Sequence, residues 1–250
     1  MAAASTILSD LPRHMHDAVR FYWQTRNKQL EKQAGSGAKD QGLRSAVAGG
    51  AQMDGFIGLL TKLVIEAGID RSHVFHNESL ELPGYFRLTE QWDFLVVVDG
   101  QLVAALAAKS QDNPSCEDNF NNRTQEAIGS ALDLWAAFRQ ETFGTGVRPW
   151  LGYLFLLEDC AASRAPVGVK EPHFKVSTEF RNSSYAERYE VFCRRLALER
   201  HYDSAVFLLS ESRAGLKGDY TEPAADLRFQ KFAQSLIAQA AAFSGRIREL

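Results

Sequence analysis

Two side chains of opposite charge lie at the ends of a largely apolar stretch, WDFLVVVDGQLVAALAAKSQ, which covers residues 92–111. Asp93 precedes the first apolar run, Lys109 closes the second, and an Asp-Gly pair separates the two runs. This arrangement predicts a hairpin of two buried strands. A lysine at the end of a buried strand loses hydration, and a nearby anion usually compensates for that loss. Asp93 on the adjacent strand is the natural partner of Lys109.

The length of the hairpin loop decides whether these two side chains share a face of the sheet. A two-residue loop, made by the Asp-Gly pair alone, puts Asp93 on the face away from Lys109. A three-residue loop that begins at Val98 adds a bulge and puts Asp93, Ala107 and Lys109 on one face. Asp-Gly permits either loop, and the need to pair the two charges favours the three-residue loop.

The hairpin lies within an alternation of helices and strands. We expect helices at 12–33, 53–67, 123–139, 184–200 and 222–248, and extended segments at 80–87, 150–157 and 204–209. From residue 53 to 157 the order is therefore helix, three strands, helix, strand. Both faces of the hairpin carry apolar side chains, so the hairpin lies inside a sheet covered on both sides. The expected fold class is α/β, with a central mixed sheet flanked by helices on both faces.

Length and composition indicate an ordinary globular protein of 250 residues, 45% hydrophobic and 24% charged. We expect one domain: an N-terminal helix and Gly-rich connector in 1–52, a core in 53–157, and a C-terminal part in 158–250 that completes the sheet. No signal peptide is evident, and no apolar run approaches the ~18 residues of a membrane span. We therefore expect a cytoplasmic protein that does not enter a membrane.

The charge balance separates one segment from the rest. The net charge is −3, which argues mildly against a protein that simply coats nucleic acid. Residues 164–217, however, contain ten Lys or Arg and seven Asp or Glu. Solvated helix faces account for most of these charges, and a phosphate-facing surface is the alternative.

Two stretches together resemble a known family. EQWDFLVVVDGQLVAALAAKSQ (90–111), followed by DNFNNRTQEAIGSALDLWAAFR (118–139), is similar to the XhoI family of type II restriction endonucleases, within the PD-(D/E)XK nuclease superfamily. The likeness is strongest over 84–143. It implies a restriction-endonuclease-like core, Mg²⁺-dependent hydrolysis of double-stranded DNA, and the palindrome CTCGAG as target. A palindromic target implies a homodimer, because the protein's two-fold symmetry mirrors that of the DNA.

The resemblance also assigns roles within the catalytic core. It implies that Asp93, residue 107 and the Ala108 carbonyl hold Mg²⁺, which polarises the scissile phosphate and activates a bound water. It implies that Lys109 orients that water and stabilises the negative charge that develops on the phosphate. The candidate catalytic residues are thus Asp93, Ala107 and Lys109, and the candidate metal-binding residues are Asp93, Ala107 and Ala108.

Position 107 departs from the family, which carries a glutamate there, whereas this chain has Ala107. Alanine offers Mg²⁺ no ligand. Either the chain is a cleavage-deficient form, or another acid serves, with Glu66 and Asp54 on the preceding helix as candidates. A DNA-binding protein on a nuclease scaffold that never cuts is the alternative of a different class. Asp93 and Lys109 weigh against it, because a retired site has no physical need for either residue.

Two polar stretches could read bases, because Arg favours guanine edges and Asn favours adenine edges. The first lies where the helix at 123–139 begins, at a helix N-terminus that also favours phosphate. The second leads into the basic segment. The candidates are Asn119, Asn121, Asn122, Arg123, Arg181, Asn182 and Ser183. Ordinary helix caps, by Asn122 or Thr124 and by Ser183 or Ser184, are the alternative.

Overall fold

A mixed five-stranded sheet forms the centre of the computed structural model, which describes residues 6–36, 50–112, 116–144 and 146–247. Its spatial order is β1 (Val74–Phe75), β4 (Phe94–Val98), β5 (Gln101–Gln111), β6 (Trp150–Glu158) and β7 (Ser204–Ser210). The first three strands are antiparallel neighbours, and β5, β6 and β7 are parallel. The expected mixed sheet is confirmed, and the C-terminal part of the chain contributes its β7 edge.

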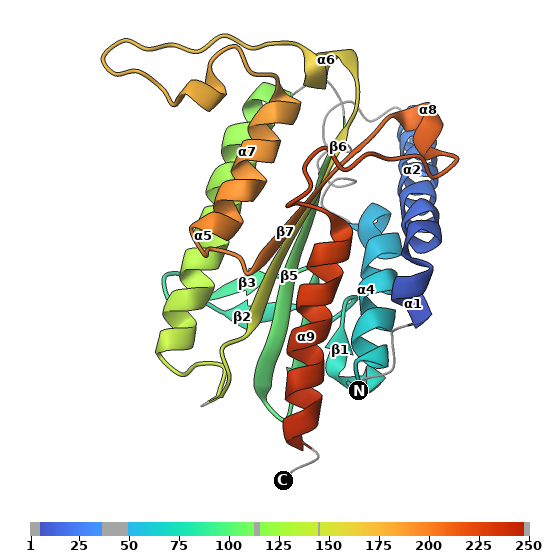
Figure 1. Ribbon diagram of the computed structural model, residues 1–250, viewed down its shortest axis with the longest axis vertical. Coiled ribbons are helices and arrows are strands. Elements are labelled where there is room, and N and C mark those ends of the chain that lie inside the picture. The colour runs from blue at the N-terminus through green and yellow to red at the C-terminus, as the bar shows by residue number, and fades with distance from the viewer. Residues whose placement is uncertain (1–5, 37–49, 113–115, 145, 248–250) are drawn as a thin grey trace.

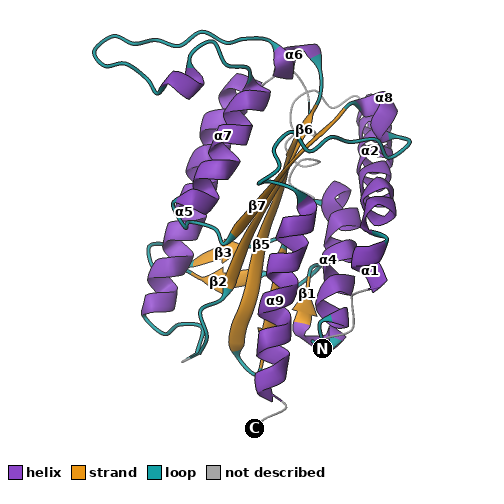
Figure 2. Cartoon of the chain, viewed as in Figure 1, coloured by secondary structure: helices purple, strands orange, loops and turns teal. Residues whose placement is uncertain are grey.

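Helices cover both faces of this sheet (Figures 1 and 2). One face packs against α2 (Leu11–Ser36), α4 (Asp54–Glu66) and α9 (Phe229–Ile247), and the other against α5 (Cys116–Arg139) and α7 (Tyr185–Leu198). The short elements are α1 (Thr6–Ser9), α6 (Ala161–Arg164), α8 (Ser212–Gly215) and the 3₁₀ turns η1 (Ala51–Met53), η2 (Arg71–His73) and η3 (Thr178–Phe180). Among the described residues, no helix has the length and apolarity needed to cross a membrane.

The expected helices are all present, but two of them begin elsewhere. α5 begins at Cys116, well before residue 123, because the Phe120 ring packs on the Tyr189 ring of α7 at a centroid distance of 5.0 Å. Such packing outweighs the weak helix propensity of the Asn residues nearby. α9 begins at Phe229 rather than at 222, and the Glu222 carboxylate accepts the Phe229 amide at 2.7 Å. Residues 37–49 of the Gly-rich connector expected within 1–52 lie outside the described residues.

The extended segment expected at 80–87 is confirmed over Glu81–Pro83 alone, and it does not join the main sheet. β2 (Glu81–Pro83) pairs with β3 (Thr89–Gln91) in a separate two-stranded sheet. The connecting loop is held toward α5 because the Asp133 carboxylate accepts the amides of Tyr85 and Phe86, each at 2.7 Å. The edge strand of the main sheet is instead β1, which is too short to show a periodic pattern.

The hairpin turn is the two-residue turn, so the expected three-residue loop is wrong. Val98 pairs with Gln101, and the loop consists of Asp99 and Gly100 alone. Their φ angles, 50° and 76°, are both left-handed. This is the geometry of a type I′ turn, which matches the right-handed twist of the flanking strands.

A β-bulge further along the hairpin supplies the register shift that a three-residue loop would have given. The pairing shifts by one residue between Val96 and Val97, which leaves Val103 on β5 without an opposite residue. Beyond the bulge, the Asp93 amide donates to the Leu106 carbonyl at 3.0 Å. A shift of one residue exchanges the two faces of a strand. Asp93 therefore lies on the same face as residues 107 and 109, as the charges of Asp93 and Lys109 predict.

A buried ion pair ties the far end of β5 to α2. Arg26 contacts Asp112, and the two side chains are only 4% and 16% exposed. The Arg26 Nη1 also donates to Gln29 at 3.0 Å. Asp112 lies three residues beyond Lys109, so this pair fixes the strand end that carries the lysine.

We expect Arg26→Met to lower the free energy of unfolding by about 3 kcal/mol, because it leaves a nearly buried carboxylate without its partner. Arg13→Met is the matched control on the same helix, since Arg13 and its partner Asp10 are both more than half exposed. That change should cost less than about 1 kcal/mol. Urea unfolding of both variants measures the difference, and equal losses would contradict a special role for the Arg26 pair.

Candidate active site

Asp93 and Lys109 form an ion pair at the end of the hairpin, as the sequence predicts. The Lys109 Nζ lies 3.1 Å from the Asp93 Oδ2. The same carboxylate oxygen accepts the Ala108 amide at 2.8 Å. Because β4 begins only at Phe94, β5 has passed the end of its antiparallel neighbour at Ala108. The Asp93 side chain takes the place of a backbone partner there, and this bond fixes its orientation.

Glu126 on α5 is a further charged group at this site, and it was not predicted from the sequence. Its Oε1 lies 3.4 Å from the Lys109 Nζ, and its Oε2 lies 2.6 Å from the Arg123 Nη1. The lysine ammonium thus lies between two carboxylates. In the sequence, Glu126 is indistinguishable from a solvated helix residue. The only signal is that the next residue, Ala127, begins the apolar face of α5.

Neighbouring opposite charges shift the pKa values of Lys109 and Glu126 toward their charged forms. Burial opposes the charge on Lys109, but Asp93 and Glu126 outweigh burial and raise the pKa of Lys109 above its ordinary value. Burial likewise acts against a charged Glu126, but Lys109 and Arg123 outweigh it and lower the pKa of Glu126. Lys109 is therefore an ammonium that donates hydrogen bonds, and it cannot act as a base in this state.

Ala107 lines a small cavity together with Lys109 and Glu126. The cavity offers about 10 Å³, roughly the room for one water molecule. Tyr153, the neighbour of Ala107 on β6, lines it as well. The Tyr153 hydroxyl is buried and has no hydrogen-bond partner among the described residues. The space beside Ala107 is thus nearly filled and is partly polar.

A larger cavity of about 260 Å³ adjoins the Asp93–Lys109 pair and includes Asp54 and His76 in its lining. Burial raises the pKa of Asp54, and His76 partly offsets that effect. Of the two acids proposed from the sequence, Asp54 therefore lies close to the site. Glu66 does not, because it lies at the opposite end of α4, where its Oε2 accepts the Ile7 amide at 3.4 Å.

The donors at this site suit a hard divalent cation, although no group of three His, Cys, Asp or Glu side chains that could hold a metal occurs in the described ranges. Mg²⁺ needs only one or two protein carboxylates, because water and substrate phosphate complete its shell. Asp93 and Glu126 both face the Lys109 ammonium. The Ala108 carbonyl points to the same side as its amide, which binds Asp93. Asp93, Glu126 and the Ala108 carbonyl are therefore the residues that fit Mg²⁺; Ala107 offers none of its side-chain atoms.

The first predicted DNA-binding stretch lies within α5 rather than before it. Asn119 and Arg123 are partly exposed, and Asn121 and Asn122 are exposed. Because α5 begins at Cys116, the interpretation of Asn122 or Thr124 as its cap is wrong. The Arg123 guanidinium points back toward Glu126 and so links this stretch to the site.

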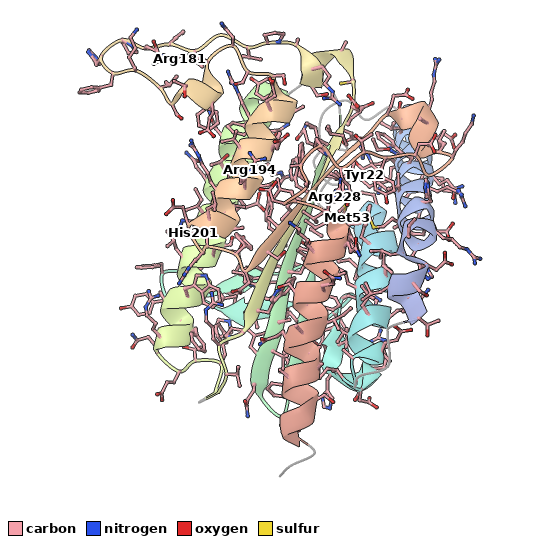
Figure 3. All side chains as sticks on the ribbon, viewed as in Figure 1. Tyr22, Met53, Arg181, Arg194, His201 and Arg228 are labelled. Atoms are coloured by element: carbon pink, nitrogen blue, oxygen red, sulfur yellow. The ribbon has the colours of Figure 1, made fainter. Side chains whose placement is uncertain are left out.

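The second stretch lies where a projecting segment returns to α7, and Figure 3 shows Arg181 on that segment. The Arg181 Nε donates to the Glu171 Oε1 at 3.0 Å, and Asn182 is exposed with a φ of 52°. Ser183 is only 4% exposed, and its hydroxyl is bonded to Phe180 and Arg188. Ser183 therefore presents little surface to a base edge in this conformation.

The structure brings the two stretches to one end of the molecule. Phe120 contacts Tyr185 at the start of α7, with ring centroids 6.3 Å apart. Ser184 caps α7 through a reciprocal pair of bonds with Glu187, as an ordinary helix start would. Fewer Lys and Arg side chains of the segment 164–217 are available to contact phosphate than their number indicates, because five of the ten are in ion pairs. These are Arg164, Lys175, Arg181, Arg194 and Arg195.

This arrangement of a mixed sheet, helices on both faces and a strand-end aspartate beside a lysine is a restriction-endonuclease-like core. The chain belongs to the XhoI restriction endonuclease family, since residues 32–222 match the family described as "Restriction endonuclease XhoI". The type II restriction enzyme BstVI of Geobacillus stearothermophilus is 51% identical over 217 residues, which cover 85% of this chain and 96% of that enzyme.

Two further relatives support the same assignment. The type II restriction enzyme AbrI of Azospirillum brasilense is 43% identical over 175 residues, covering 70% of this chain and 78% of that enzyme. The type II restriction enzyme XhoI of Xanthomonas vasicola is 40% identical over 194 residues, or 77% of each chain. No solved structure matches the chain.

The ion pairs of the site predict a measurable change in the titration of Glu126. We expect Lys109→Met to raise the pKa of Glu126, because burial is then opposed by Arg123 alone. Carbon-detected NMR of the side-chain carboxyl measures this value in both proteins. The pKa of Glu126 is lower in the folded wild-type protein than in the unfolded chain. Its ionised carboxylate therefore stabilises the fold fully at pH values above the unfolded-state pKa. This stabilisation is lost as the pH falls through the folded-state pKa. An unchanged titration in Lys109→Met would contradict the contact.

Proposed function

We propose that this chain is a Mg²⁺-dependent type II restriction endonuclease that hydrolyses double-stranded DNA at a specific palindrome. The observation that carries the proposal is the ammonium of Lys109, which lies between the carboxylates of Asp93 and Glu126 at the end of two buried strands. A cation-binding pair of carboxylates beside a fixed positive charge suits phosphodiester hydrolysis. Membership of a restriction endonuclease family supports DNA as the substrate.

Each residue of the site has a distinct part in this proposal. Asp93, Glu126 and the Ala108 carbonyl would hold Mg²⁺, which when bound polarises the scissile phosphate and lowers the pKa of a coordinated water. The Lys109 Nζ donates hydrogen bonds to a phosphate oxygen and to the attacking water. Its raised pKa keeps it charged as the negative charge on the phosphate grows.

Ala107 bears on whether this chain itself cuts. The hypothesis that it is cleavage-deficient follows if Asp93 contributes the only carboxylate. The contact between Glu126 and Lys109 favours the other hypothesis, that a different acid serves. The alternative of a different class, a DNA-binding protein that never cuts, rests on Ala107 alone and leaves the paired Asp93 and Lys109 without a purpose.

The finer parts of the proposal come from likeness to the family. We propose CTCGAG as the target and a homodimer as the active form, because a palindrome presents the same contacts twice. The cytoplasmic location expected from the sequence stays a prediction. We propose that the exposed Asn121 and Asn122 read bases. The further candidates for base contacts are Asn119, Arg123, Arg181 and Asn182. Ser183 supports the loop that carries Asn182.

A gel-shift and cleavage assay tests the proposed activity on a duplex that contains CTCGAG, with a scrambled duplex as the control. We expect specific binding without metal and double-strand cleavage only when Mg²⁺ is added. The assay includes Ala107→Glu, which restores the family's carboxylate, and cutting by either protein supports the proposal. If both bind the site and neither cuts with Mg²⁺ or Mn²⁺, the non-cutting alternative holds.

A residue that reads bases and a residue that contacts phosphate should affect DNA binding differently when each is replaced by alanine. The first should change sequence discrimination, and the second should change the salt dependence of the affinity. Asn122→Ala should weaken specific binding by about 1–3 kcal/mol and flatten discrimination at one base pair. Lys170→Ala, in the exposed projecting segment, should weaken binding to all sequences alike and reduce the salt slope by about one. Fluorescence titrations across salt concentrations measure both effects. If neither variant changes affinity, the DNA-binding surface lies elsewhere.

A further inference from the structure

We propose that Glu126 supplies the carboxylate that strand position 107 lacks, so that this chain cleaves DNA with Ala107 in place. The inference rests on the proposed nuclease function and assigns one residue of its site. Its starting point is the Lys109 ammonium, which lies 3.1 Å from Asp93 Oδ2 and 3.4 Å from Glu126 Oε1. Mg²⁺ is usually bound through one or two protein carboxylates, and these two carboxylates both lie next to the Lys109 ammonium.

The space beside Ala107 supports this assignment. A glutamate at 107 would extend into the cavity that Ala107, Lys109 and Glu126 line together. That cavity has room for roughly one water, and Trp92 also belongs to its lining. Glu126 and a glutamate at position 107 would therefore line the same cavity.

The other acids near the site are less suited to the role. Glu90 lines the same cavity, but its two oxygens are taken by Arg87 and by the Ser130 hydroxyl, which donates at 2.6 Å. Asp54 lies in the larger cavity, whose lining does not include Ala107. Glu126 contacts Lys109 through one oxygen, and Arg123 holds its other oxygen.

The proposal also gives Arg123 a defined part. Its Nη1 holds the second oxygen of Glu126 at 2.6 Å, so one oxygen is fixed and the other faces the site. With Mg²⁺ bound, Asp93 and Glu126 would no longer need Lys109 to compensate their charge. The lysine is then available for the substrate phosphate. Arg123 is in this sense a positioning residue, which acts through Glu126.

Metal binding by the free protein is the first test, because it does not depend on turnover. We compare the chain with Glu126→Gln, which keeps the shape but removes the charge, by calorimetric titration with Mn²⁺. Glu126→Gln should weaken Mn²⁺ binding by about tenfold or more. Glu66→Gln is the matched control, a helix glutamate at the far end of α4, and should leave binding unchanged. Equal affinity in all three proteins would overturn the proposal.

Single-turnover cleavage of the CTCGAG duplex is the second test. The chain should cut with Mg²⁺, and Glu126→Gln should lose about 100-fold in rate through a misplaced ion while keeping metal-free DNA binding. Adding Ala107→Glu to Glu126→Gln should recover part of that loss, because either position then offers a carboxylate to the same cation. Glu66→Gln should cut as the unaltered chain does.

The outcomes separate this inference from the nuclease function on which it rests. If the chain does not cut but Ala107→Glu does, the nuclease function stands and Glu126 is not the replacement. Glu126 is likewise excluded as the replacement if Glu126→Gln cuts as fast as the unaltered chain. If neither the chain nor Ala107→Glu cuts, the nuclease function itself fails.

Discussion

One extra residue in β5 determines the chemistry that this site can support. The bulge at Val103 moves every later side chain of β5 to the opposite face relative to β4. Without it, the two-residue turn would leave Asp93 on one face and Lys109 on the other. With it, the two side chains meet at 3.1 Å. Because of the bulge, the hairpin keeps the tight turn that the twist of the strands favours and still carries both charges on one face.

Partial burial makes those charges depend on one another. Lys109 is 22% and Asp93 27% exposed, so neither is fully hydrated, and each compensates the other. α5 adds Glu126 and Arg123 to the same network, because the crossover helix between the parallel strands β5 and β6 packs on the strand that carries Lys109. The pKa of Lys109 is raised and that of Glu126 is lowered for one reason: opposite charges outweigh burial.

The sequence predicts the parts of this structure that depend on local patterns. Two apolar runs on either side of an Asp-Gly pair predict the hairpin, helix patterns predict α2, α4 and α7, and the strand-end charges predict the Asp93–Lys109 contact. Local patterns could not give β1, whose two residues show no period, or Glu126, which reaches Lys109 only through tertiary packing. A bulge was predicted, but in the turn, because Asp-Gly allows both turns and nothing in the sequence marks Val103.

Position 107 shows why a sequence motif predicts metal binding less reliably than the positions of the carboxylate oxygens in the folded site. A metal responds to where carboxylate oxygens lie and not to which element carries them. The strand offers position 107 and the helix offers Glu126, and both open on the cavity beside Lys109. A chain with a carboxylate on the helix can lose the one on the strand and still present two oxygen donors to a cation. If the chain is the nuclease that we propose, Ala107 therefore does not by itself leave the cation with one carboxylate, because Glu126 lines the same cavity as Ala107 and Lys109.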